Sequence, residues 1–245
     1  MKQGRNGKSV FGNILKNMMG PFYQAGDDSI LFKQGNKSSG SATPELMNLM
    51  DARLVVIPET EKSHRFNIKR VKSLTGGDMV TGRALYCDQI SFKLTCKFIV
   101  MTNEKPPIDV NDSASIDRLK PIPFLAKFDN NPANCKYVKW LESQQDQFFT
   151  LAVKGAVKWY QSEFGLPSIK CINKFKQDYI EENDDIGLYL QECKENKTMQ
   201  IYSKVAVSEI YNCEPTRKQL MDFNKVMIKR GYKKDKNMNG TYFVI

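Results

Sequence analysis

Gly4-Arg5-Asn6-Gly7-Lys8-Ser9 opens a stretch in which apolar residues recur at helical spacing until Gly20-Pro21. Those apolar residues are Val10, Phe11, Ile14, Leu15 and Met18. A glycine-rich loop at the start of a helix lets backbone N–H groups surround a phosphate, and the helix dipole favours the negative charge. In such loops a lysine reaches the outer phosphates and a hydroxyl holds a magnesium ion. The sequence therefore predicts a phosphate-binding turn at residues 4–9.

This loop departs from the complete P-loop pattern, G-x-x-x-x-G-K-[ST]. That pattern requires a glycine where this chain has Lys2, and a β-strand before the loop, for which the chain has no residues. Without that strand, we expect unpaired backbone groups at the flanks of the strands Leu54–Ile57 and Phe98–Met101. For the same reason we expect a mobile start, weak nucleotide binding and weaker hydrolysis.

Short apolar runs at Leu54–Ile57 and Phe98–Met101 are typical of parallel strands that are buried on both faces. Ile30–Phe32 is a further strand candidate, and Met79–Leu94 has the pattern of a hairpin that turns at Asp88-Gln89. Because these strands alternate with helical segments, the sequence predicts an α/β fold with a parallel sheet.

Polar residues follow both of the apolar runs. Glu59 and Glu61 come after Leu54–Ile57, and Asn103 comes after Phe98–Met101. Acids at the carboxyl end of a parallel strand can hold a magnesium-bound water and activate it. Each of these signals is weak alone, since most strands end in something polar.

The second half of the chain has a different pattern. Residues Tyr137–Phe164 are predicted to be helical, and a glycine and a proline follow them. Three amphipathic segments and a short basic hairpin then predict a winged helix-turn-helix. The segments are Tyr179–Cys193, Ala206–Asn212 and Arg217–Lys229. With a boundary near Ser168–Ile172, the predicted domains are residues 1–170 and 171–245.

The 245 residues carry a formal net charge of +10, which favours a polyanionic partner such as nucleic acid. No apolar run approaches the roughly 20 residues of a membrane span, and no signal-peptide core is present, so we expect an intracellular protein without a membrane partner. The six cysteines include no C-x-x-C pair and there is one histidine, which argues against an ordinary zinc site and for reduced thiols. They are Cys87, Cys96, Cys135, Cys171, Cys193 and Cys213.

The order of the motifs is more informative than any one of them. In chain order they are the loop at residues 4–9, a strand with glutamates, Lys72-Ser73-Leu74-Thr75-Gly76-Gly77-Asp78 with Arg83, a strand ending in Thr102-Asn103, and Arg118-Leu119 before Ile122-Pro123-Phe124. This series resembles superfamily 3 helicases, especially the primase-helicases of phages, plasmids and large DNA viruses such as poxviruses. The resemblance runs from Gly4 to about Phe124 and continues more weakly into the terminal winged helix.

The resemblance implies an AAA+-like α/β domain, here without its first strand, that acts in DNA replication as a homo-hexamer. It also implies ATP and Mg²⁺ as cofactors at the subunit interfaces. By that likeness Lys8 would contact the outer phosphates and Ser9 the magnesium. Gly4, Asn6 and Gly7 would shape the loop.

The remaining roles also follow from the resemblance alone. Glu59 would be the Walker B acid that helps to hold the metal, and Glu61 would share that role. Asn103 would orient the attacking water, and Arg118 would be the finger supplied to a neighbouring subunit.

Three basic residues, Lys72, Arg83 and Lys93, would by the same likeness face the pore of a ring and hold a single DNA strand. Duplex DNA would bind at the winged helix. Whether a primase region precedes this segment is left open.

Two functions therefore stay open at this point. One is an ATP-dependent helicase module that couples hydrolysis to DNA translocation. The other is a non-catalytic DNA-binding remnant of such a helicase with an incomplete P-loop. A small-molecule kinase would not explain the segment from Lys72 to Arg83.

Overall fold

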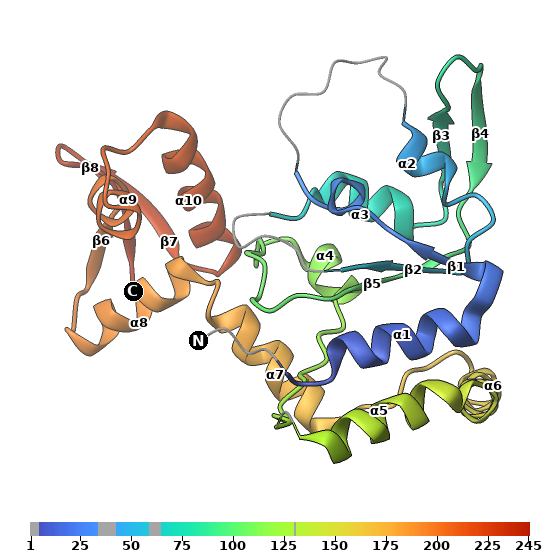
Figure 1. Cartoon of the computed structure of the whole chain (residues 1–245). Coiled ribbons are helices and arrows are strands. Elements are labelled where there is room, and N and C mark those ends of the chain that lie inside the picture. The colour runs from blue at the N-terminus through green and yellow to red at the C-terminus, as the bar shows by residue number, and fades with distance from the viewer. Residues whose placement is uncertain (1–4, 34–42, 59–64, 130) are drawn as a thin grey trace. The chain divides into compact units, whose positions relative to one another are not determined.

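The computed structural model describes residues 5–33, 43–58, 65–129 and 131–245, and the chain divides into two compact units (Figure 1). Unit 1 comprises Met1–Ile108 and Asp117–Phe175, and unit 2 comprises Asp109–Ile116 and Lys176–Ile245. In the described ranges, none of the helices has the length and apolar character needed to cross a bilayer.

Unit 1 is built on a parallel sheet of three strands, β1 (Tyr23–Ala25), β2 (Leu54–Ile57) and β5 (Lys97–Val100), in the order β1-β2-β5. All four residues of β2 are buried, because the strand lies in the centre of the sheet. The predicted α/β fold with a parallel sheet is confirmed.

The expectation that Leu54–Ile57 has unpaired backbone groups is wrong. Tyr23 pairs with Leu54 on one side of β2, and Lys97 pairs with Leu54 on the other. Three residues that carry no strand signal of their own therefore complete the pairing of β2. β5 is paired with β2 and forms an edge of the sheet as far as the described residues show it.

Helices cover both faces of this sheet (Figure 1). α1 (Lys8–Met19) lies on one face and packs against α5 (Pro132–Ser143) and α6 (Gln145–Gln161). The amide of Asn13 donates a hydrogen bond of 2.7 Å to Oε1 of Glu142 on α5. The predicted helix over Tyr137–Phe164 is thus two helices that meet at Gln144.

The other face carries α2 (Pro44–Met47) and α3 (Ile68–Thr75). α3 begins at a cap, since Oδ1 of Asn67 accepts a hydrogen bond from the backbone N–H of Arg70. A buried cluster beneath these helices includes Leu49, Val55 and Ile57.

The predicted strand Ile30–Phe32 is largely absent. Asp28–Ile30 form a single 3₁₀ turn, and a second 3₁₀ turn of the same length, Gly20–Phe22, directly follows α1. The carboxylate of Asp27 caps the turn Asp28–Ile30, because it accepts a hydrogen bond of 2.8 Å from the N–H of Ser29. Within the described part of this segment, the β-pairing is one isolated antiparallel bridge between Phe32 and Phe66.

The predicted hairpin is present as β3 (Met79–Arg83) and β4 (Gln89–Lys93), paired antiparallel, but the chain turns at residues 84–88 and not at Asp88-Gln89, because Gln89 already pairs with Arg83. Val80 and Phe92 face the core, and a Cβ on Gly82 would lie 2.9 Å from Sδ of Met47. α4 (Ser113–Arg118) follows β5 along the chain.

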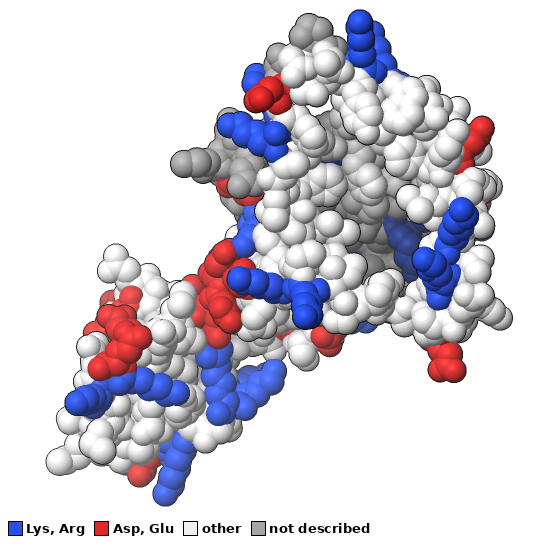
Figure 2. All heavy atoms as spheres, turned by 90° about the horizontal axis from the view of Figure 1, so that it is seen from below, with Lys and Arg blue, Asp and Glu red and all other residues white. Residues whose placement is uncertain are grey.

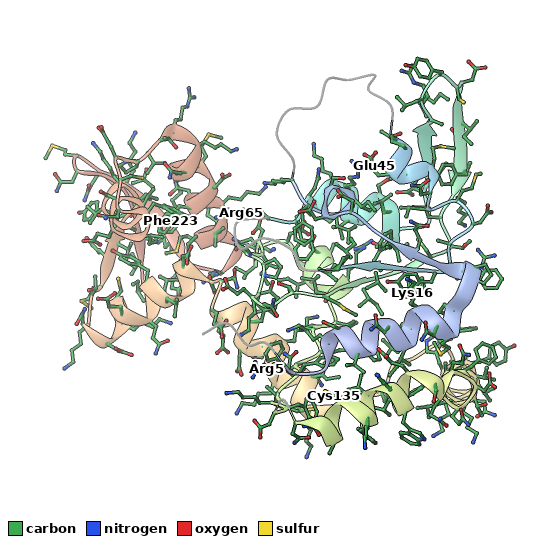
Figure 3. All side chains as sticks on the ribbon, viewed as in Figure 1. Arg5, Lys16, Glu45, Arg65, Cys135 and Phe223 are labelled. Atoms are coloured by element: carbon green, nitrogen blue, oxygen red, sulfur yellow. The ribbon has the colours of Figure 1, made fainter. Side chains whose placement is uncertain are left out.

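Unit 2 contains α8 (Asp185–Glu195), α9 (Ser203–Tyr211), α10 (Arg217–Lys229) and an antiparallel sheet in the order β6-β8-β7. Its strands are β6 (Gln200–Tyr202), β7 (Lys233–Asn237) and β8 (Gly240–Val244). Phe223, Met227 and Phe243 form the centre of its core, and Phe223 is labelled in Figure 3. This order of elements supports the winged-helix prediction, which stays a prediction.

The predicted segment Tyr179–Cys193 is interrupted. α7 (Lys170–Glu181) ends before Asp184, whose side chain accepts from the N–H of Gly187 and caps α8. The same carboxylate forms an ion pair with Arg230 at 2.6 Å. Asp184 is therefore occupied as a cap and an ion-pair partner, and this explains the break in the helix.

Candidate nucleotide and DNA sites

The N-terminus of α1 has the backbone geometry that an anion requires. Gly7 precedes the helix with φ of 87°, a left-handed conformation that glycine adopts without strain. The first helical bond joins the N–H of Phe11 to the carbonyl of Gly7 at 2.9 Å. Within the described chain no side chain caps this helix end. The N–H groups of its first turn therefore have no helical acceptor and can donate to an anion.

A segment far along the chain fixes the loop before α1. The amide of Asn6, which is 8% exposed, donates to the carbonyl of Phe124, and the N–H of Phe128 donates to the carbonyl of Arg5 at 2.9 Å. A Cβ on Gly7 would touch the ring of Phe128 at 3.4 Å. Arg5–Gly7 are thus held by residues 124–128. Sequence reasoning missed Phe128 altogether, and Gly4 lies outside the described residues.

Two of the predicted site residues meet directly. Nζ of Lys8 donates a hydrogen bond of 2.8 Å to Oδ1 of Asn103. α1 is placed for this contact by close packing on the end of β5, since a Cβ on Gly12 would lie 2.8 Å from Cε of Met101. The lysine of the glycine-rich loop and the amide of Asn103 after β5 are therefore in direct contact, and together they define one candidate site.

The carboxyl end of β2 lies beside the contact between Lys8 and Asn103. Ile57 is opposite Val100 in the register, and the carbonyl of Ile57 accepts from the N–H of Met101 at 2.9 Å. Glu59 and Glu61 follow β2 but lie outside the described residues. Of the predicted metal ligands, Ser9 is the one that the structure describes, on the first turn of α1. Across the described ranges there is no group of three His, Cys, Asp or Glu residues with metal-binding geometry.

Arg118 lies against α3. Its Nε donates to Oγ1 of Thr75 at 3.1 Å, and that hydroxyl donates to the carbonyl of Val71 at 2.6 Å. The predicted finger is therefore bonded to the C-terminal turn of the helix that carries Lys72.

The hairpin β3–β4 has one polar, exposed face. Arg83 is opposite Gln89 and Lys93 is opposite Met79, so these two basic residues point to the same side of the hairpin. Between them, the hydroxyls of Thr81 and Ser91 lie 3.2 Å apart. Four residue steps along the strand separate the two positions, a distance of about 13 Å.

Lys93 is the member of this face that lies near α3. A Cβ on Gly77, in the turn after α3, would be 3.6 Å from Cε of Lys93. The structure thus brings Lys93 to the end of the Lys72 helix and places Arg83 farther out along the same face.

Unit 2 has a second basic surface. Every residue of β7 is exposed, including Lys233, Lys234 and Lys236. On β8, the hydroxyl of Tyr242 donates to Oδ2 of Asp235 at 3.2 Å. Asp235 is therefore engaged within the hairpin, and the three lysines dominate its surface. On the face of the molecule in Figure 2, lysine and arginine side chains are scattered and do not form one stripe.

Comparison with known proteins gives a consistent set of relatives. A sequence model of the family DUF5906, described as a family of unknown function, matches residues 2–118. A putative helicase (L207/L206) of Acanthamoeba polyphaga mimivirus is 38% identical over 136 residues, which is 56% of this chain and 14% of that protein. The putative helicase 022R of Frog virus 3 is 33% identical over 144 residues, covering 55% of this chain and 15% of that protein.

A third relative is the putative primase C962R of African swine fever virus, 26% identical over 129 residues, which is 53% of this chain and 13% of that protein. The chain thus spans about one seventh of the length of the relatives it matches. Among solved structures, the C-terminal region of NrS-1 (residues 305–718) is similar with a TM-score of 0.52 at 15% identity, over all of this chain and 64% of that one. This likeness is one of fold.

Proposed function

We propose that this chain is the nucleotide-hydrolysing, DNA-translocating module of a viral-type replication helicase. The observation that carries the proposal is the hydrogen bond of 2.8 Å between Lys8 and Asn103 at the N-terminus of α1. It joins the two predicted site residues that would flank the terminal phosphate of a nucleotide. Relatives named as putative viral helicases and a putative primase support the same class of function.

ATP fits the described part of the site. The uncapped first turn of α1 offers backbone N–H donors, and Gly7 brings that backbone close to a ligand without a side chain in the way. The Lys8 ammonium would neutralise the outer phosphates. Mg²⁺ would take the hydroxyl of Ser9 as one ligand, and Glu59 would supply the acid. When bound, ATP and Mg²⁺ would supply the phosphoanhydride to be cleaved and the charge that stabilises the leaving oxygens.

The side chains of this protein would promote that reaction by orienting the reacting groups and by stabilising charge. Asn103 would orient a water for in-line attack, and Lys8 would stabilise the negative charge that develops on the phosphate oxygens. Arg118 would act on the site of a neighbouring copy. Arg118 donates a hydrogen bond to Thr75 on α3. Movement of Arg118 toward another subunit would therefore break this bond and change the contacts of the helix that carries Lys72.

DNA would bind the polar face of the β3–β4 hairpin. Arg83 and Lys93 point to the same side, and Lys72 belongs to the helix whose end lies under Lys93. Cations spaced along one face suit the repeating phosphates of a single strand. Phosphate contacts of this kind carry no sequence information, as a translocating enzyme requires.

Assembly into a ring, a homo-hexamer by the resemblance, is part of the proposal. α6 has no buried residue and exposes Phe149, Leu151, Trp159 and Tyr160. Apolar surface of this extent on one helix is typical of an interface. A neighbouring copy would bury it and would bring an Arg118 to the nucleotide.

A second candidate function is DNA binding without turnover. The observation that favours it is the basic hairpin of unit 2, since Lys233, Lys234 and Lys236 are exposed whether or not unit 1 hydrolyses a nucleotide. Duplex DNA is the expected ligand of this surface. An upstream primase region and other replication proteins stay predictions, as does the intracellular location.

The experiment that separates the two candidates is ATP hydrolysis by the purified chain with and without single-stranded DNA. Hydrolysis that DNA stimulates and that Lys8→Ala abolishes supports the helicase module. DNA binding that persists in Lys8→Ala without any hydrolysis in either protein supports the second candidate.

A further inference from the structure

Unit 2 contains a groove whose lining residues belong to none of the candidate nucleotide or DNA sites. It has a volume of about 740 Å³ and lies between α8, β6 and α9. Its lining includes residues of all three elements, such as Leu188, Ile201 and Val205. We propose that this groove docks a basic amphipathic helix of a partner protein.

The charge of the groove opposes that of the chain. Three carboxylates line it, those of Asp185, Glu192 and Glu209, and its lining, which falls wholly within the described residues, contains no lysine or arginine. The chain as a whole has a net charge of +10. A local acidic site on a basic protein repels nucleic acid and attracts a cationic partner. The charge therefore selects a basic protein segment over DNA or RNA.

The groove also offers apolar anchor points on two walls. Leu188 on α8 is 53% exposed and Val205 on α9 is 52% exposed. Between them, Ile201 on β6 is almost fully buried. An amphipathic helix lays apolar side chains at i, i+3 or i+4, and i+7 into a groove of this kind and leaves its polar residues at the rim. Lysine or arginine at those rim positions would meet Glu192 and Glu209.

The walls of the groove are fixed before any partner binds. The hydroxyl of Tyr189 on α8 donates a hydrogen bond of 2.6 Å to Oε2 of Glu209 on α9. Burial, and then this bond to a carboxylate, raise the pKa of Tyr189 far above its usual value, so the tyrosine stays a donor at neutral pH. Because the carboxylate of Glu209 is already held in place, a partner does not have to order it, and binding costs less entropy.

The test uses the full chain and a fluorescein-labelled synthetic helix with leucine at the i, i+3, i+4 and i+7 positions and lysine elsewhere. The comparison peptide has glutamate in place of each lysine. We expect fluorescence anisotropy to show binding of the lysine peptide that weakens with salt, and no binding of the glutamate peptide.

Two variants of α8 make the test specific. Glu192→Lys should weaken binding of the lysine peptide about tenfold or more, whereas Glu195→Lys, the same charge reversal on the same helix outside the groove lining, should change it less than about twofold. Leu188→Asp should remove binding while both units keep their circular-dichroism melting curves. If Leu188→Asp destabilises unit 2, Val205→Asp on the other wall replaces it.

Three results would overturn the proposal. The first is equal binding by Glu192→Lys and Glu195→Lys, and the second is equal binding of the lysine and glutamate peptides. The third is a concentration-dependent dimer in sedimentation that Leu188→Asp dissolves, because the groove would then be an interface between copies of this chain.

Discussion

Nζ of Lys8 and Oδ1 of Asn103 lie 2.8 Å apart, although 95 positions separate the two residues in the chain. The contact joins the first residue of α1 to the turn that follows β5. Two structural features make it: Gly7 in a left-handed conformation, which starts the helix, and Gly12, which lets α1 approach Met101.

Arg118→Ala is expected to abolish ATP hydrolysis and to leave ATP affinity within about threefold, because a finger acts on the transition state of a neighbouring site. Mixing the variant with the wild-type chain and measuring turnover against the mixing ratio checks this. Thr75→Val, which removes one hydrogen-bond acceptor of Arg118, is the control and should keep more than about half of the activity. Mixtures whose activity simply averages the two proteins would rule out action between subunits.

Arg83→Gln combined with Lys93→Gln should lower the affinity for single-stranded DNA and reduce the slope of log K against log salt by about 1.4, since roughly 0.7 is lost for each phosphate contact. Lys16→Gln removes one exposed charge from α1 and is the single-charge control (Figure 3). Fluorescence anisotropy over a range of salt concentrations gives both slopes. An unchanged slope in the double variant would place the DNA elsewhere.

The basic hairpin of unit 2 should bind duplex DNA weakly through phosphates. Replacing Lys233, Lys234 and Lys236 by glutamine is expected to reduce the salt slope for duplex DNA by about 2.7, at roughly 0.9 per contact. All three side chains are exposed, so the melting temperature should not change. Duplex binding by the triple variant that equals that of the wild type would leave this hairpin as a protein-docking surface.

Cysteine labelling tests the two cores. Burial raises the pKa of Cys96 and of Cys193, so less reactive thiolate forms at pH 8 than in an open thiol, and both residues are shielded from reagent. Brief treatment of the native chain with iodoacetamide should modify the four exposed cysteines and spare these two, as read by mass spectrometry of the digest. The exposed set is Cys87, Cys135, Cys171 and Cys213. Labelling in denaturant is the control and should reach all six.

Much of unit 1 could be predicted because its signals are local. α1 follows from apolar spacing between two glycine-containing turns, and the first strand of the hairpin, β3, alternates between exposed and buried residues. β2 was recognisable because a strand buried on both faces must be apolar along its whole length.

The features that sequence reasoning missed depend on distant partners. Tyr23–Ala25 have no strand pattern and become β1 by pairing with β2. The anchoring of the loop by Phe124 and Phe128 joins segments more than a hundred positions apart. Residues Asp109–Ile116 belong to unit 2, where Nζ of Lys229 donates to the carbonyl of Asn111 at 2.9 Å. Local periodicity carries no information about such contacts.

The helices of unit 2 were predicted from amphipathic segments, but their ends were not. The break between α7 and α8 depends on Asp184, which caps α8 and forms an ion pair with Arg230, 46 positions farther along the chain. A capping box in which Thr216 and Gln219 bond reciprocally begins α10 and could have been read from the sequence.

The most direct test of the central claim is MgATP binding by the wild-type chain, Lys8→Ala, Asn103→Ala and Lys16→Ala, measured by isothermal titration calorimetry. We predict binding by the wild type and by Lys16→Ala with equal affinity, and a loss of about tenfold or more in Lys8→Ala, because in the proposed site the Lys8 ammonium would be the charge nearest the phosphates. Asn103→Ala should bind MgATP nearly as well as the wild type but should hydrolyse it more slowly. Equal affinity of Lys8→Ala and the wild type would contradict the assignment of a nucleotide site at the N-terminus of α1.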